Sequence, residues 1–164
     1  MTRSFNQTAG YLILAAYLVS FTPAQAQTQL THDHGHAEHG DMQIELDHGR
    51  RWATDAPLRE GMERIRAAVD VARQAGARGG LNTTQAQALA AATEDGIAFM
   101  IQHCRLEPKA DANLHILLGR LSAAATVVKV NPMAADGLPQ ILEVLDIYPR
   151  HFAHPGWQAI ARGH

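Results

Sequence analysis

A stretch near the N-terminus concentrates side chains that can bind metal ions. Residues 31–42 read THDHGHAEHGDM and place four histidines within eight positions, with acidic residues among them. Because side chains alternate along an extended chain, His32, His34 and His36 point to the same side, and one ion can bridge two or three of them. His39 lies close enough to complete the set. Neutral imidazole suits copper(II), nickel(II) and zinc(II), with affinity rising toward copper.

Two interpretations of this stretch are open. Histidine-rich tracts are typical of metal binding, and a segment of this kind needs no fold to chelate an ion. Its affinity would fall as the pH drops through about 6.5, where imidazole takes up a proton. The other interpretation is a solvated spacer that happens to be rich in histidine. We expect an arm that captures metal ions, copper first and zinc or nickel as alternatives.

The first 26 residues are typical of a secretory signal peptide. Arg3 supplies the positive start, residues 11–21 form an apolar run, and Ala24-Gln25-Ala26 provides a small-x-small cleavage site. The run is too short for a membrane-spanning helix, which needs roughly 20 apolar residues. We therefore expect cleavage before Gln27, a periplasmic mature protein, and no membrane contact after cleavage.

Composition narrows the class of protein further. The 164 residues carry a formal net charge of -2 with no basic stripe, which argues against nucleic acid as a partner. Aromatic residues make up only 5% of the chain, while alanine and leucine abound, which favours helices. Cys104 is the only cysteine, so the chain forms no internal disulfide. Its thiol is then buried, paired with another chain, or bound to a metal.

The elements that must position these side chains are helical. Residues 27–52 form a polar arm with a short alternating stretch from Met42 to Leu46 and a turn at Asp47-His48-Gly49. Residues 53–157 show apolar side chains at steps of three and four, the spacing of amphipathic helices, and residues 158–164 form a tail. Helix starts are expected at Asp55 with Pro57, at Asn82 or Thr83, at Pro108, and at Asp136 with Pro139.

Four amphipathic helices with short connections predict an all-α protein, an up-down-up-down four-helix bundle. In a bundle with that connectivity, the first and third helices begin at the end of the bundle where the second and fourth helices finish. At about 1.5 Å rise per residue, Met62, His103 and His115 should then lie within roughly 10 Å of each other along the axis. Cys104 and His151 fall at the same end.

A thioether, a thiol and imidazoles gathered at one end would suit copper or a haem iron. We therefore predict a second, softer metal site formed by Met62, His103, Cys104 and His115. Each residue also has a plainer explanation. Methionine and cysteine commonly fill cores, and a histidine in the last turn of a helix complements the helix dipole.

Two short motifs resemble a known family. Residues 60–71, EGMERIRAAVDV, look like the first helix of the soluble b-type cytochromes of four-helix-bundle form, and residues 115–121, HILLGRL, are similar to their third helix. The expected fold is also similar to that of the periplasmic cytochromes c-prime. In the b-type family an early methionine of the first helix is an axial haem ligand, so the resemblance implies that Met62 binds haem b.

The second axial ligand of that family is a histidine directly after a tyrosine in the last helix. Here Tyr148 is followed by Pro149. The resemblance therefore leaves His151, His154 or His115 for this role, and we predict His151.

No catalytic motif is present. The chain lacks H-E-x-x-H, G-x-S-x-G and a phosphate-binding loop, and Asp111 with His115 could be an ordinary one-turn contact. We expect a metal-binding protein that is not an enzyme. The alternatives are a haem-b electron carrier and an interaction module that docks a periplasmic protein partner through Trp157 and the tail.

Overall fold

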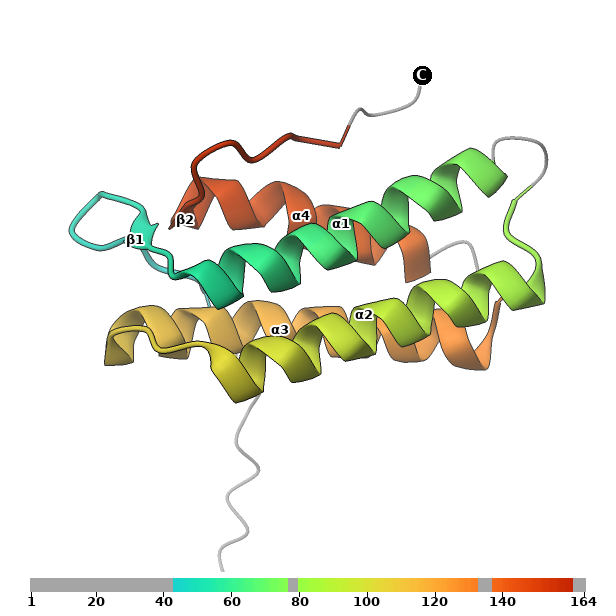
Figure 1. Ribbon diagram of the computed structural model, residues 1–164, viewed down its shortest axis with the longest axis horizontal. Helices are drawn as coiled ribbons and strands as arrows, with labels where there is room; N and C mark the ends of the chain where they lie inside the picture. The colour runs from blue at the N-terminus through green and yellow to red at the C-terminus, as the bar shows by residue number, and fades with distance from the viewer. Residues whose placement is uncertain (1–42, 77–79, 133–136, 161–164) are drawn as a thin grey trace, which may run out of the picture. The chain divides into compact units, whose positions relative to one another are not determined.

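The computed structural model describes residues 43–76, 80–132 and 137–160, and the signal peptide and residues 27–42 of the arm lie outside them. Consecutive helices run in opposite directions and pack against each other (Figure 1). The all-α prediction with four helices is confirmed. The elements are β1 (Trp52–Ala53), α1 (Ala56–Gly76), α2 (Thr83–His103), α3 (Pro108–Val130), α4 (Gly137–His151) and β2 (Phe152–Ala153).

Capping side chains start the helices where the sequence indicates. An oxygen of Asp55 accepts the backbone N–H of Leu58 at 2.8 Å, at the start of α1. Asn82 begins α2 with a reciprocal capping box to Gln85. Glu107, directly before the proline that opens α3, accepts a backbone N–H of that helix's first turn. These local bonds satisfy amide groups that would otherwise lack partners.

The apolar side chains of each helix meet in one core. The predicted seam of α1 is at most 4% exposed throughout, and it consists of Leu58, Met62, Ile65, Val69 and Ala72. In α2 two neighbouring apolar residues differ in burial. Met100 is fully buried, whereas the side chain of Ile101 is 58% exposed.

Two glycines let α1 and α2 approach closely. A Cβ atom at Gly61 would lie 2.3 Å from Cγ of Met100 and 3.3 Å from the backbone oxygen of Gly96. A Cβ at Gly96 would lie 2.7 Å from Cγ1 of Ile65. Any larger side chain would therefore overlap the opposite helix.

The N-terminal segment (residues 43–55) is tied to the bundle. Residues 43–46, predicted to be a short strand, form none, and Glu45 instead donates its backbone N–H to Oδ1 of Asn113 at 2.7 Å. The carbonyl of Glu45 accepts the indole N–H of Trp52 at 2.7 Å. The predicted turn is confirmed, with positive φ at His48 and Gly49.

The C-terminal segment (residues 152–160) returns along α4 and lies beside α1 (Figure 1). β2 pairs in parallel with β1, with Trp52 opposite Phe152. Trp157 and Ile160 pack against the core further along. The first and last helices, α1 and α4, contact each other less than consecutive helices do. The C-terminal segment lies over the seam between α1 and α4, where His154 contacts both helices. No helix in the described ranges is long and apolar enough to cross a membrane.

Candidate functional site

The end of the bundle that carries the predicted ligands is held together by Asp55. One carboxylate oxygen caps α1, and the other accepts the backbone N–H of Arg105, just past α2, at 2.6 Å. The thiol of Cys104 donates to the same carboxylate. Burial, the charge of Asp55 and this hydrogen bond raise the pKa of Cys104 to about 12. The thiol is therefore protonated at neutral pH. Its partner is the carboxylate of Asp55, not another predicted metal ligand.

Each of the three histidines of the bundle that were predicted as ligands contacts a backbone carbonyl oxygen of its own helix. The Nδ1 atoms of His103, His115 and His151 lie 2.8, 2.9 and 3.1 Å from the carbonyl oxygen four residues earlier. Because a carbonyl only accepts, each ring donates from Nδ1 and keeps Nε2 for other partners. His103 also stacks on Phe99 with ring centroids 4.5 Å apart. These rings lie along three separate helices.

The predicted softer metal site is not assembled in the described structure. Met62 is fully buried in the core, while His103 and His115 are exposed. In residues 43–160, apart from the gaps at 77–79 and 133–136, no three His, Cys, Asp or Glu side chains are grouped to hold a metal ion. His32, His34, His36 and His39 lie outside the described residues.

The two predicted axial haem ligands differ in their surroundings. Met62 is fully buried in the core, whereas His151 is the last residue of α4 and is half-buried. A groove of about 440 Å³ opens elsewhere, between α3 and α4. It is lined by Gln43, Arg120, Ala123, Gln140, Glu143, Val144 and Ile147. Neither predicted axial ligand reaches that groove.

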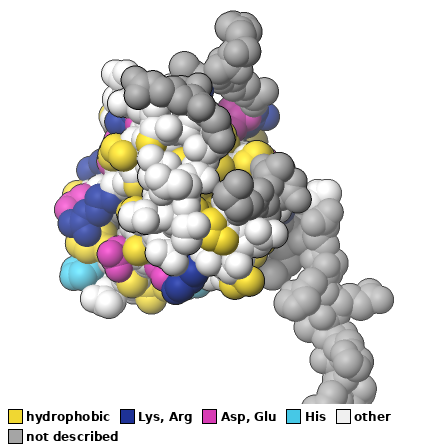
Figure 2. All heavy atoms as spheres, turned by 90° about the vertical axis from the view of Figure 1, so that its right-hand side faces the viewer, with side chains coloured by type: hydrophobic (Ala, Val, Ile, Leu, Met, Phe, Trp, Pro, Cys, Tyr) yellow, Lys and Arg dark blue, Asp and Glu magenta, His cyan; other side chains and the backbone are white. Residues whose placement is uncertain are grey.

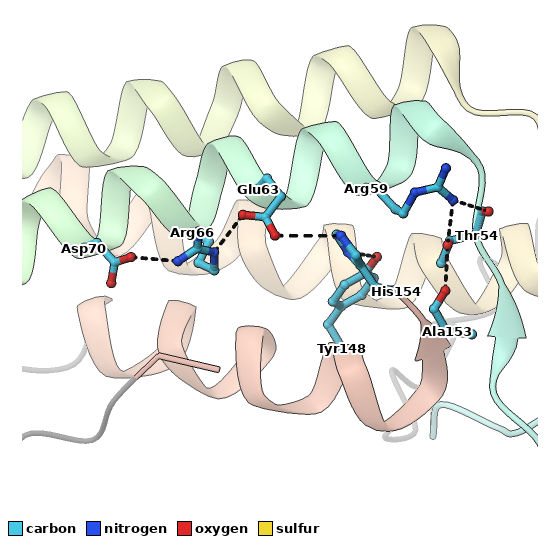
Figure 3. Close-up of polar contacts among 8 residues, drawn as sticks. All are labelled: Thr54, Arg59, Glu63, Arg66, Asp70, Tyr148, Ala153 and His154. Carbon is cyan, nitrogen blue, oxygen red and sulfur yellow. Dashed lines mark hydrogen bonds and ion pairs between the residues drawn. The ribbon is translucent and has the colours of Figure 1, made fainter. Parts of the chain in front are cut away.

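A chain of polar side chains links the C-terminal segment to α1 and α4 (Figure 3). Nδ1 of His154 lies 3.0 Å from the hydroxyl oxygen of Tyr148, and Nε2 lies 3.7 Å from Oε1 of Glu63. The other oxygen of Glu63 accepts from Nε of Arg66 at 2.7 Å, and Arg66 continues to Asp70 at 2.9 Å. The chain therefore begins inside the bundle and ends on its surface.

An acid, an imidazole and a phenol in line can act as a proton relay, but here the phenol cannot reach a substrate. Tyr148 is fully buried and the side chain of His154 is 5% exposed. The indole of Trp157 packs on both rings at 4.9 and 5.1 Å. Burial raises the pKa of Tyr148 and lowers the pKa of His154. The arrangement is a buried polar contact that attaches the C-terminal segment.

Only part of this network can be anticipated from the amino-acid pattern. The dense stretch YPRHFAHPGW contains Tyr148, His154 and Trp157, and His154 was among the candidates for the second haem ligand. Glu63 was missed because a charged residue beside a helix seam looks like any solvated side chain. Trp157, expected to serve an outside partner, packs within the chain.

The surface outside this network is mixed in charge. On the opposite end of the bundle, acidic and basic side chains lie next to each other among small polar and apolar ones (Figure 2). A typical pair joins α2 and α3, where Nζ of Lys129 lies 3.0 Å from the carboxylate of Glu94. No protein-family model, no curated protein and no solved structure matches the chain.

Proposed function

We propose that the mature protein, beginning near Gln27 in the periplasm, binds divalent transition metal ions through its histidine-rich arm. The observation that carries this proposal is the set His32, His34, His36 and His39 within eight positions, interleaved with carboxylates. Copper is the preferred ion because it binds imidazole sites most tightly among the divalent metals considered.

The bundle supports this proposal as an anchor. The last residues of the arm are attached to α3 by the bond from Glu45 to Asn113, and Trp52 is 6% exposed. These contacts keep the arm attached to a folded domain while its histidines bind an ion. We propose a binding role rather than a catalytic one, because the one acid–imidazole–phenol set described is shielded from solvent.

The test compares metal stoichiometry among three versions of the protein from Gln27 onward, purified without an affinity tag and without added metal. The first is the wild type. The second replaces the four arm histidines with alanine. The third is a matched control that replaces His103, His115 and His151 with alanine. Titration with copper, nickel or zinc is followed by calorimetry, and helicity is followed by circular dichroism.

We expect the arm variant to lose its metal equivalents with unchanged helicity, while the control variant retains them. Equal stoichiometry in the wild type and the arm variant would overturn the proposal. The absorption spectrum and elemental content of the same wild-type sample test the alternative. A Soret band with about one iron per chain would replace metal capture by haem binding.

A further inference from the structure

We propose that His154 is a pH-sensitive contact that holds the C-terminal segment on the bundle and releases it when the imidazole is protonated. This inference does not depend on metal binding. It rests on the position of His154, whose ring bridges the segment to α4 through Tyr148 and faces α1 through Glu63 (Figure 3).

The attached state requires a neutral ring. The carboxylate of Glu63 only accepts, so Nε2, which faces it, carries the proton of the neutral ring. Nδ1 is then the acceptor of the Tyr148 hydroxyl hydrogen across 3.0 Å. The Nε2–H group then points toward Glu63 at 3.7 Å. A second proton would have to sit on Nδ1, where it would remove the acceptor of the Tyr148 hydroxyl. The hydrogen of that buried hydroxyl would then lack an acceptor, which is costly.

The surroundings also disfavour a positive charge. Burial is the main reason that the pKa of His154 is lowered, and the guanidinium groups of Arg59 and Arg66 on α1 act in the same direction. Glu63 opposes them, but its carboxylate is already paired with Arg66 at 2.7 Å. On α4 the group that faces the ring is Tyr148. Residues 152–160 contain no other ionisable side chain.

Few hydrogen bonds hold the segment on the bundle. Two-residue β2 and the bond from Thr54 to the carbonyl of Ala153 hold only the start of the segment. The Nε1 atom of Trp157 is buried and has no hydrogen-bond partner among the residues that the structure describes, which lowers the stability of the attached state. Release would expose the aromatic rings of Tyr148 and Trp157 and the seam between α1 and α4.

The direction of the pH effect follows from linkage. Because the attached state binds the proton less tightly than the released state, attachment is strongest above the ordinary histidine pKa of about 6.5 and weakens as the pH falls below it. One proton is taken up per opening. The opening constant should therefore rise by up to about tenfold per pH unit below that point.

Hydrogen exchange of the metal-free protein from Gln27 onward tests this. Amide protection of residues 152–160, corrected for intrinsic exchange rates, is compared at about pH 7.5 and about pH 5 with that of α3. We expect selective loss of protection in the segment at the lower pH. His154→Asn, which keeps an acceptor near Tyr148, should remove this dependence, whereas the matched control His151→Asn should keep it.

Protection of the segment that is independent of pH in the wild type, or a pH dependence that persists in folded His154→Asn, would overturn the proposal. If His154→Asn does not fold, the ring is titrated by NMR in the wild type. A midpoint below about 6.5, coinciding with loss of segment protection, supports the contact. A midpoint at or above that value rejects it.

Discussion

The thiol of Cys104 should be unusually slow to react, and this can be measured directly. The pKa of Cys104 is raised from 9.0 to about 12, first by burial and then by Asp55. At pH 8 a thiol of pKa 9.0 is about one-tenth thiolate, whereas one of pKa about 12 is about one ten-thousandth thiolate. The reactive fraction thus falls about a thousandfold.

A more basic thiolate is also a better nucleophile, which recovers part of this loss. With a Brønsted coefficient of about 0.4–0.5, a rise of three pKa units increases intrinsic nucleophilicity about 20-fold. The net expectation is alkylation about fiftyfold slower than that of an unfolded chain. Because Cys104 is partly exposed and solvent screens the charge of Asp55, a slowing of about tenfold is the lower bound.

The assay is the rate of iodoacetamide alkylation against pH, in native and in urea-unfolded protein. The unfolded rate should level off near pH 9, while the native rate should still be rising at pH 10. That difference separates a raised pKa from simple steric protection, which lowers the rate without moving the profile. Asp55→Asn keeps the helix cap but removes the charge, so it should accelerate the native reaction. A native profile that levels off near pH 9 would refute the electrostatic reasoning.

Two further predictions concern the core. Gly61→Ala should lower the free energy of unfolding by up to about 2 kcal/mol, because overpacking costs about 1–3 kcal/mol and the gain in helix propensity offsets about 1 kcal/mol. Gly119→Ala, at a site with open space, should be neutral or stabilising, and urea unfolding showing equal effects would contradict the close contact of α1 with α2. Stability should also fall as the pH rises above 10, because burial raises the pKa of Tyr148 above its ordinary 10.0 and the unfolded phenol ionises first. Tyr148 is the only tyrosine from Gln27 onward, so tyrosinate absorbance reports it alone, and a native midpoint near 10 would contradict its burial.

The amino-acid sequence by itself determined the helices. Caps at Asp55 and Asn82 and the proline that opens α3 act on groups one turn away, so their effect can be read locally. The apolar spacing of α1 likewise predicted its buried face, residue by residue. The antiparallel order of consecutive helices followed from their short connections.

The candidate site could not be read in the same way. Helix order brings Met62, His103, Cys104 and His115 to one end, but a shared end does not make a shared site. Whether side chains converge depends on rotation about each helix axis, and the histidines turn to carbonyls of their own helices. Asp55, expected only as a cap, is also the partner of Cys104.

The tertiary structure alone decided how residues 43–55 and 152–160 attach to the bundle. The carboxylate of Glu63 meets His154 from 91 positions later in the chain, and β1 pairs with β2 across a similar separation. Such contacts depend on where the packed helices leave a seam uncovered, here between α1 and α4. A local sequence pattern does not predict the position of that seam. The metal-binding histidines remain a prediction from sequence, since chelation by an arm requires only ligand spacing. The buried contact at His154 exists only because folding closes the seam between the first and last helices.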